Sequence, residues 1–262
     1  MSLRSTPALR ALDSSLLSNR YPVHFGGMKT AADDPFRLNT FGKISQAFYR
    51  AMGRIPVVPF SGPYNLTISH ERKFVWFRVA KVGTRTILDY FKKNSIPLDV
   101  ARAGFLYYSP ELYEDHFKFA FVRNPWDRLV SCWTDKVVNL NYFKFAESEL
   151  ATMRRFDSFV EYVSRLDLET CDRHLRLQCR LIDLNHLDFL GRMETFEQDF
   201  RKVCIRLKFP QQPIPSRNVS RKRPFQEYYN DSLRVRVEEI YARDIQTFGY
   251  SFGPSDGAAR TQ

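Results

Sequence analysis

A short run of cationic and hydroxyl-bearing residues, Lys81 to Thr86, has the composition of an anion-binding loop. It reads Lys-Val-Gly-Thr-Arg-Thr and lies between a β-branched, aromatic run at residues 73–80 and a helix-like segment at 85–93. The amides that begin a helix carry positive partial charge, and Thr hydroxyls add hydrogen-bond donors. Lys81 supplies a full charge, and Gly83 lets the backbone approach an anion closely. We therefore expect a phosphate group at this loop.

This loop differs from the nucleotide-binding loop of ordinary P-loop kinases and GTPases. Their signature, G-x-x-x-x-G-K-[ST], does not occur anywhere in the chain. Taken alone, a plain strand-to-helix turn with a surface lysine explains the run equally well. A second feature is needed to decide between the two interpretations.

That second feature follows the apolar run FKFAFV at residues 117–122. Arg123 stands at the expected end of this strand, and a turn into the next helix brings Ser131 within its reach. An Arg fork with a Ser hydroxyl suits a second phosphate, and such ligands bind at strand ends in open parallel sheets. In the same segment, Asp127 and Arg128 read as an exposed helix face.

Strands alternate with helices along the chain, which predicts an α/β fold with a central parallel sheet of about five strands flanked by helices. The expected strands cover residues 73–80, 117–122 and 187–193, and the expected helices cover residues 85–93, 126–138, 194–207 and 231–247. We expect one domain at residues 61–252. An N-terminal extension at residues 1–60, with a short helix at 43–52, precedes it, and a disordered tail at residues 253–262 follows.

The composition indicates a basic, packed globular protein. Hydrophobic residues make up 44% of the chain, and 40 Lys and Arg against 29 Asp and Glu give a net charge of +11. Such an excess attracts polyanions without choosing between nucleic acid, glycans, phosphorylated cofactors and membrane surfaces. No apolar run reaches the roughly 20 residues of a membrane span, and no secretory signal is recognisable.

The four cysteines show no metal-binding spacing, so we expect free thiols in a reducing compartment. A disulfide between Cys171 and Cys179 is the alternative if the protein is secreted. No cluster of metal ligands is visible in the sequence, and we expect no metal.

Together, the two candidate anion sites resemble the PAPS-binding signatures of sulfotransferases. RVAKVGTRT resembles the 5'-phosphosulfate loop, and FVRNPWDRLVSCW resembles the 3'-phosphate element. Two later segments, CRLIDLNHLDFLGRMETFEQDF and IPSRNVSRKRPFQEYYN, follow in the family's order. The resemblance spans Leu66 to Phe252. It is closest to the Golgi-type carbohydrate enzymes, the group of chondroitin, dermatan and HNK-1 sulfotransferases.

This resemblance implies a single P-loop-like sulfotransferase domain that moves a sulfuryl group from PAPS (3'-phosphoadenosine 5'-phosphosulfate) to a hydroxyl and releases PAP. Lys81 would stabilise the bridging oxygen and the 5'-phosphate. The residues expected around that phosphate are Val82, Gly83, Thr84, Arg85 and Thr86. The residues expected at the 3'-phosphate are Arg123 and Ser131, with further donor contacts from Ser220, Arg221 and Lys222. The alternative for these last three is a solvated basic loop.

A general base must remove the proton of the acceptor hydroxyl. His174 follows Asp172 by two residues and resembles the histidine of a [DE]-x-H segment in the carbohydrate group. Glu194, after the third expected strand, is the second candidate. His70 and His116 flank expected strands, and we interpret both as structural.

The sequence also departs from the family. Arg85 stands where a smaller or polar residue is common, and the membrane anchor of the Golgi members is missing. These departures favour a soluble, cytoplasmic relative of bacterial type, with a Golgi-lumen catalytic fragment as the alternative. We expect an anionic glycan acceptor in an open basic cleft, and no nucleic acid partner. A nucleotide kinase-like enzyme and a non-enzymatic polyanion-binding module are the competing functions.

Overall fold

A computed structural model describes residue 44 and residues 63–107, 109–214 and 223–253. The predictions for the N-terminal extension at residues 1–60 therefore fall outside the described residues, except at Ile44. The tail after Gly253 is likewise outside them.

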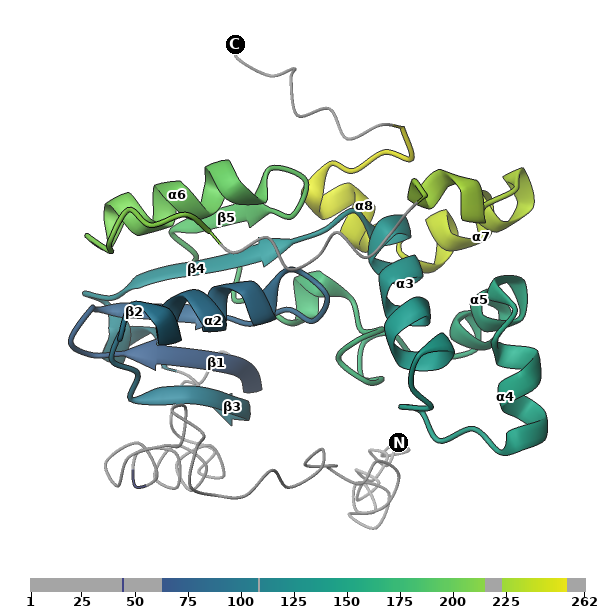
Figure 1. The fold of residues 1–262 in the computed structure, drawn as a ribbon, viewed down its shortest axis with the longest axis horizontal. Helices are drawn as coiled ribbons and strands as arrows, with labels where there is room; N and C mark the ends of the chain where they lie inside the picture. The colour runs from purple at the N-terminus through teal and green to yellow at the C-terminus, as the bar shows by residue number, and fades with distance from the viewer. Residues whose placement is uncertain (1–43, 45–62, 108, 215–222, 254–262) are drawn as a thin grey trace, which may run out of the picture. The chain divides into compact units, whose positions relative to one another are not determined.

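The core of the described structure is a five-stranded sheet in the order β3-β1-β2-β4-β5, flanked by helices (Figure 1). The strands are β1 (Pro63–Ser69), β2 (Phe74–Phe77), β3 (Val100–Tyr107), β4 (Phe117–Val122) and β5 (Phe189–Arg192). This arrangement confirms the predicted α/β fold. The four residues of β2 are all buried, as expected for a strand covered on both faces.

The parallel arrangement holds for β2, β4 and β5, whereas β1 is antiparallel to both of its neighbours. The reason is the short connection between β1 and β2. The chain reverses through a turn in which the Lys73 amide donates to the His70 carbonyl at 3.4 Å. A connection this short can join only antiparallel strands.

The helices are α2 (Thr84–Lys93), α3 (Pro125–Trp133), α4 (Glu147–Met153), α5 (Phe156–Ser164), α6 (Phe196–Arg206), α7 (Asp231–Ile240) and α8 (Ala242–Phe248). Short 3₁₀ turns cover Pro110–Tyr113, Gln178–Arg180 and Phe225–Tyr228. The predicted helix at 126–138 ends differently, because α3 passes into a π-helical turn at Thr134–Val138. The predicted helix at 231–247 is divided at Tyr241.

Two apolar cores hold these elements together. In the first, α2 and α6 lie side by side over the sheet, where Phe200 contacts the rings of Tyr90 and Phe91. The second lies among α3, α5 and α7, beyond the carboxyl end of β4 (Figure 1). The two cores together fix the ends of β2 and β4 relative to α3. All four cysteines are free thiols.

Candidate active site

A pocket of about 950 Å³ opens where β2 and β4 end. The predicted site residues that line it are Lys81, Gly83, Thr84, Arg85, Arg123, Ser131, His174 and Glu194. The side chains of Val82 and Thr86 are buried and do not line the pocket. Ser220, Arg221 and Lys222 lie outside the described residues. The two predicted anion sites, the Lys81 loop and the Arg123–Ser131 segment, thus meet in one pocket; they are called the two constellations below.

The loop after β2 presents the start of α2 to this pocket. Gly83 is the N-cap of α2 and has a φ of 78°, in the left-handed region. The Thr84 hydroxyl donates to the Val79 carbonyl at 2.9 Å, which fixes the Thr84 side chain against the loop. The first turn of α2 contains no acidic residue, and Gly83 offers no side chain to cap it. The helix start is therefore free to receive an external anion.

Lys81 reaches into the pocket and forms an ion pair with Asp135, with 2.8 Å between Nζ and Oδ2. Arg85 and Lys136 approach the same carboxylate, at 3.9 and 3.5 Å. Burial lowers the pKa of Lys81, and the hydrogen bond that Lys81 donates to Asp135 opposes that shift. Sequence reasoning missed Asp135, because only the π turn after α3 brings it to Lys81.

Arg123 ties the two constellations together. Its Nη1 donates to the Lys81 carbonyl at 3.1 Å, and its Nε donates to Asp127 at 2.6 Å. Its backbone amide is bound by Gln178 Oε1 at 3.0 Å. The guanidinium is therefore held beside the Lys81 loop, at the same pocket as Ser131.

The interpretation of Arg128 as exposed is wrong, because only 2% of its surface is accessible. Its guanidinium donates to the carbonyls of Ala80, Arg173 and Arg176, at 3.0 to 3.2 Å. A buried cation needs such partners, and these three carbonyls supply them. Arg128 thereby braces the loop after β2 against the segment that carries His174.

His174 faces the pocket from a buried position, with 8% of its surface exposed. Its Nδ1 lies 2.7 Å from Asp172 Oδ1, and burial lowers its pKa to about 4. At neutral pH the imidazole is therefore uncharged and has one nitrogen able to accept a proton.

Glu194 also lines the pocket, but both of its oxygens already accept hydrogen bonds. Oε1 binds the Asn124 amide at 2.6 Å, and Oε2 binds the Tyr250 hydroxyl at 3.1 Å. These contacts connect the start of α3 to the C-terminal segment. The geometry favours His174 over Glu194 as a group that takes a proton.

Comparison with protein families gives one match, to the model of the sulfotransferase family over residues 64–251. The chain belongs to the sulfotransferase family. The match covers both constellations, β1 from Tyr64 onward, the other four strands and the helices α2 to α8. Comparison with curated proteins and with solved structures gives no significant match.

In this sulfotransferase, none of the helices in the described ranges has the length and apolar character that a bilayer crossing requires. Among the same residues, no group of three or more His, Cys, Asp or Glu side chains is arranged to hold a metal ion.

Gly83→Ala is expected to weaken binding of PAP, measured by calorimetry, about tenfold. A Cβ at this position would lie 3.1 Å from the Phe196 ring and 3.3 Å from the Met193 sulfur. The positive φ adds roughly 1–2 kcal/mol of strain for an L residue. The loop must shift to relieve both.

Gly249→Ala is the matched control for this substitution. Gly249 also has a positive φ, 63°, but a Cβ there meets nothing within 4 Å. Both variants are expected to lose thermal stability, while only Gly83→Ala loses PAP affinity. Equal affinities in the two variants would contradict a role of the loop in binding the donor.

Proposed function

We propose that this sulfotransferase transfers the sulfuryl group of PAPS to a hydroxyl of an anionic glycan and releases PAP. The observation that carries the proposal is the convergence of two anion-binding elements on one pocket. The Lys81 loop with the start of α2 forms one element, and Arg123 with Ser131 forms the other. PAPS carries phosphate groups at its 5' and 3' positions, so its two anionic ends match two separate sites.

The reaction is a displacement at sulfur, in which the acceptor oxygen forms a bond to sulfur and the bond to the bridging oxygen breaks. His174 is suited to take the acceptor proton through Nε2, because Nδ1 is engaged by Asp172. Lys81 is suited to stabilise the negative charge that develops on the 5'-phosphate as it leaves. Arg123 and Ser131 would hold the 3'-phosphate and so fix the position of PAPS in the pocket.

Three further arginines support an anionic acceptor. Arg78, Arg102 and Arg173 line the pocket, and Arg78 is 8% exposed. Burial and the neighbouring charges of Arg173 and Arg102 lower the pKa of Arg78 to about 9. Arg78 directly follows β2, and Arg102 lies on β3. In the sheet, β3 and β4 are on opposite sides of β2, so Arg102 and Arg123 approach the Lys81 loop from opposite sides. Negative groups on an acceptor would relieve this repulsion. That the acceptor is a glycan is supported by the sequence resemblance to the carbohydrate enzymes.

Calorimetric titration with PAP and with AMP tests the donor site. The two ligands differ by the 3'-phosphate, so tight binding of PAP and weak binding of AMP are expected. Arg123→Ala should weaken PAP binding roughly tenfold to a hundredfold, since a charged phosphate contact contributes about 1.5–3 kcal/mol. AMP binding should fall much less, because AMP has no 3'-phosphate and is affected only through the contact of Arg123 with the Lys81 carbonyl. Arg165→Ala, at an exposed arginine on the end of α5, should behave as wild type.

The same titration separates the competing functions. A nucleotide kinase-like enzyme would lose donor binding when EDTA removes Mg²⁺. A polyanion-binding module would bind PAP and AMP equally weakly, and salt would abolish both. Either result would exclude the proposed function.

A further inference from the structure

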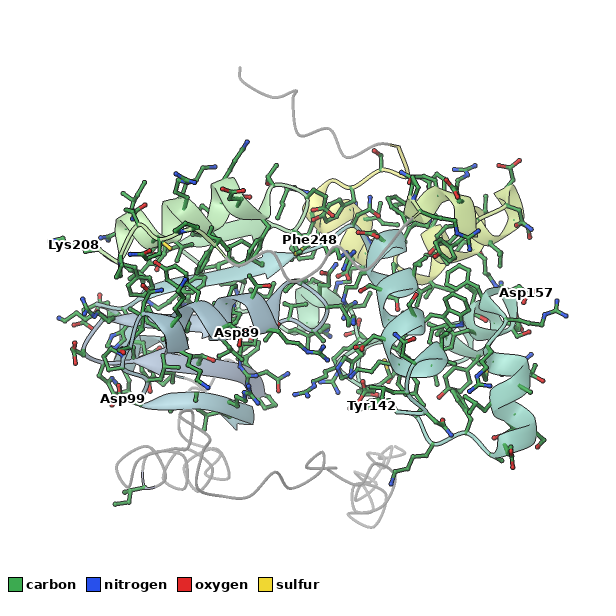
Figure 2. All side chains as sticks on the ribbon, viewed as in Figure 1. Asp89, Asp99, Tyr142, Asp157, Lys208 and Phe248 are labelled. Carbon is green, nitrogen blue, oxygen red and sulfur yellow. The ribbon has the colours of Figure 1, made fainter. Side chains whose placement is uncertain are left out.

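The segment that follows α3 turns back toward the pocket. The π turn at Thr134–Val138 is closed by the Asn139 amide, which donates to the Thr134 carbonyl at 3.0 Å. The Tyr142 amide then donates to the Lys136 carbonyl at 2.9 Å. Single π turns inserted into helices occur frequently at functional sites. Here the turn directs Asp135 to Lys81 and brings Tyr142, labelled in Figure 2, to the segment that carries His174.

Tyr142 contacts both members of the Asp172–His174 pair. Its hydroxyl donates to Asp172 Oδ2 at 3.1 Å. Its ring stands edge to face against the imidazole of His174, with 4.8 Å between the centroids. The ammonium group of Lys136 lies 4.6 Å from the centroid of the Tyr142 ring and holds the ring from another side. Tyr142 does not line the pocket itself; these contacts fix it beside the Asp172–His174 pair, although 36% of its surface is exposed.

The contacts of Asp172 divide between its two oxygens. Oδ1 accepts from His174 Nδ1 at 2.7 Å and from the His174 amide at 2.9 Å. Oδ2 is held by Tyr142. A carboxylate fixed at only one oxygen can rotate about its last bond, and the imidazole would then lose its fixed acceptor. With both oxygens held, the proton of neutral His174 stays on Nδ1, and Nε2 keeps its lone pair.

We propose that Tyr142 is a positioning residue for the reaction, because its hydroxyl anchors Asp172 and thereby keeps His174 in the tautomer that accepts a proton at Nε2. The inference rests on the proposed function, in which His174 is the base. It adds Tyr142, which lies 30 positions before Asp172 in the sequence and belongs to neither donor-binding constellation.

The protonation of His174 reports on this arrangement. The groups that face its ring are Asp172, Tyr142, Lys136 and Arg173. Burial lowers the pKa of His174 most, and the two cations lower it further, while Asp172 opposes them. Loss of the Tyr142 hydroxyl releases Oδ2 of Asp172, so the carboxylate can follow the imidazolium, and the Tyr142 ring encloses the imidazole of His174 less tightly. Both effects raise the pKa.

The test is NMR of protein labelled with ¹⁵N-histidine, in wild type, Tyr142→Phe and Tyr162→Phe, with His174→Gln to assign the signal. In wild type, His174 should be the Nδ1–H tautomer at neutral pH. Tyr142→Phe should give a mixture of tautomers and a protonation midpoint about one pH unit higher. Tyr162, on α5, packs its ring against Phe145 and Phe159, and its substitution should change neither observable. An unchanged tautomer and midpoint in Tyr142→Phe would overturn the inference.

Titration of the same samples with PAP separates this inference from the proposed function. If wild type binds PAP in preference to AMP and Tyr142→Phe binds it equally well, the variant is folded and the NMR result decides the role of Tyr142. If wild type shows no preference for PAP, the proposed function fails, and the inference fails with it whatever the tautomer of His174.

Discussion

Lys81→Ala is expected to slow turnover of PAPS by a factor on the order of 10² to 10³, the loss typical of removing one group that stabilises a developing negative charge. In our proposal, Lys81 meets the charge that grows on the leaving 5'-phosphate. Single-turnover consumption of PAPS measures the effect, including hydrolysis by water if no acceptor is supplied. Lys92→Ala, at an exposed lysine in the last turn of α2, is the control and should be unaffected.

The pH dependence of turnover gives a second check on Lys81. Its pKa lies below the ordinary lysine value of 10.5, because burial disfavours the charged form. The stabilising charge is present below this pKa and is lost as the pH rises through it. The alkaline limb of turnover should therefore begin below pH 10.5. Asp135 holds the pKa up, so Asp135→Asn should shift this limb to lower pH. A limb that does not move in Asp135→Asn would contradict the assignment.

The donor side of this site could be predicted from the sequence because its signals are local. The Lys81 loop and the Arg123 turn each follow an uninterrupted apolar run, and a short run of this kind predicts a buried strand. The predicted run at residues 117–122 is β4 with the same bounds. The strand β1 was missed, because its buried positions include the polar residues Asn65, Thr67 and Ser69. Polar side chains that are buried against the strands beside them give no hydrophobic pattern.

Contacts between distant segments are the part that the sequence did not reveal. Asp135 meets Lys81 across 54 positions, and Tyr142 meets Asp172 across 30. Both contacts depend on one π turn, and the composition of residues 134–138 does not predict such a turn. Arg128 has the spacing of an exposed helical residue, yet carbonyls 45 and 48 positions away surround it. Such partners follow from the fold and from no local pattern.

His174→Gln is expected to reduce sulfuryl transfer to a glycan acceptor by a factor of about 10² to 10⁴, the usual contribution of a general base. Binding of PAP should stay unchanged, because the backbone amide and the ring of His174 form their hydrogen bonds with Asp172, away from the Lys81 loop and Arg123. His186→Gln is a suitable control, since His186 is also paired with a carboxylate, Asp183, but does not line the pocket.

The acid limb of transfer locates the base independently of the substitution. A base acts in its neutral form, and the pKa of His174 is lowered to about 4. The neutral fraction is therefore complete at pH 6 and above, and it falls to one half near pH 4. Transfer should be flat from pH 8 down to about pH 5, whereas an exposed histidine would already lose activity near its ordinary pKa of 6.5. A limb centred near 6.5, or one that survives in His174→Gln, would exclude His174 as the base and return Glu194 to consideration.

Because Asp172 is itself ionised down to a pKa of about 2, it stays a hydrogen-bond acceptor through this whole range. A loss of activity between pH 5 and 3 would therefore not reflect protonation of Asp172.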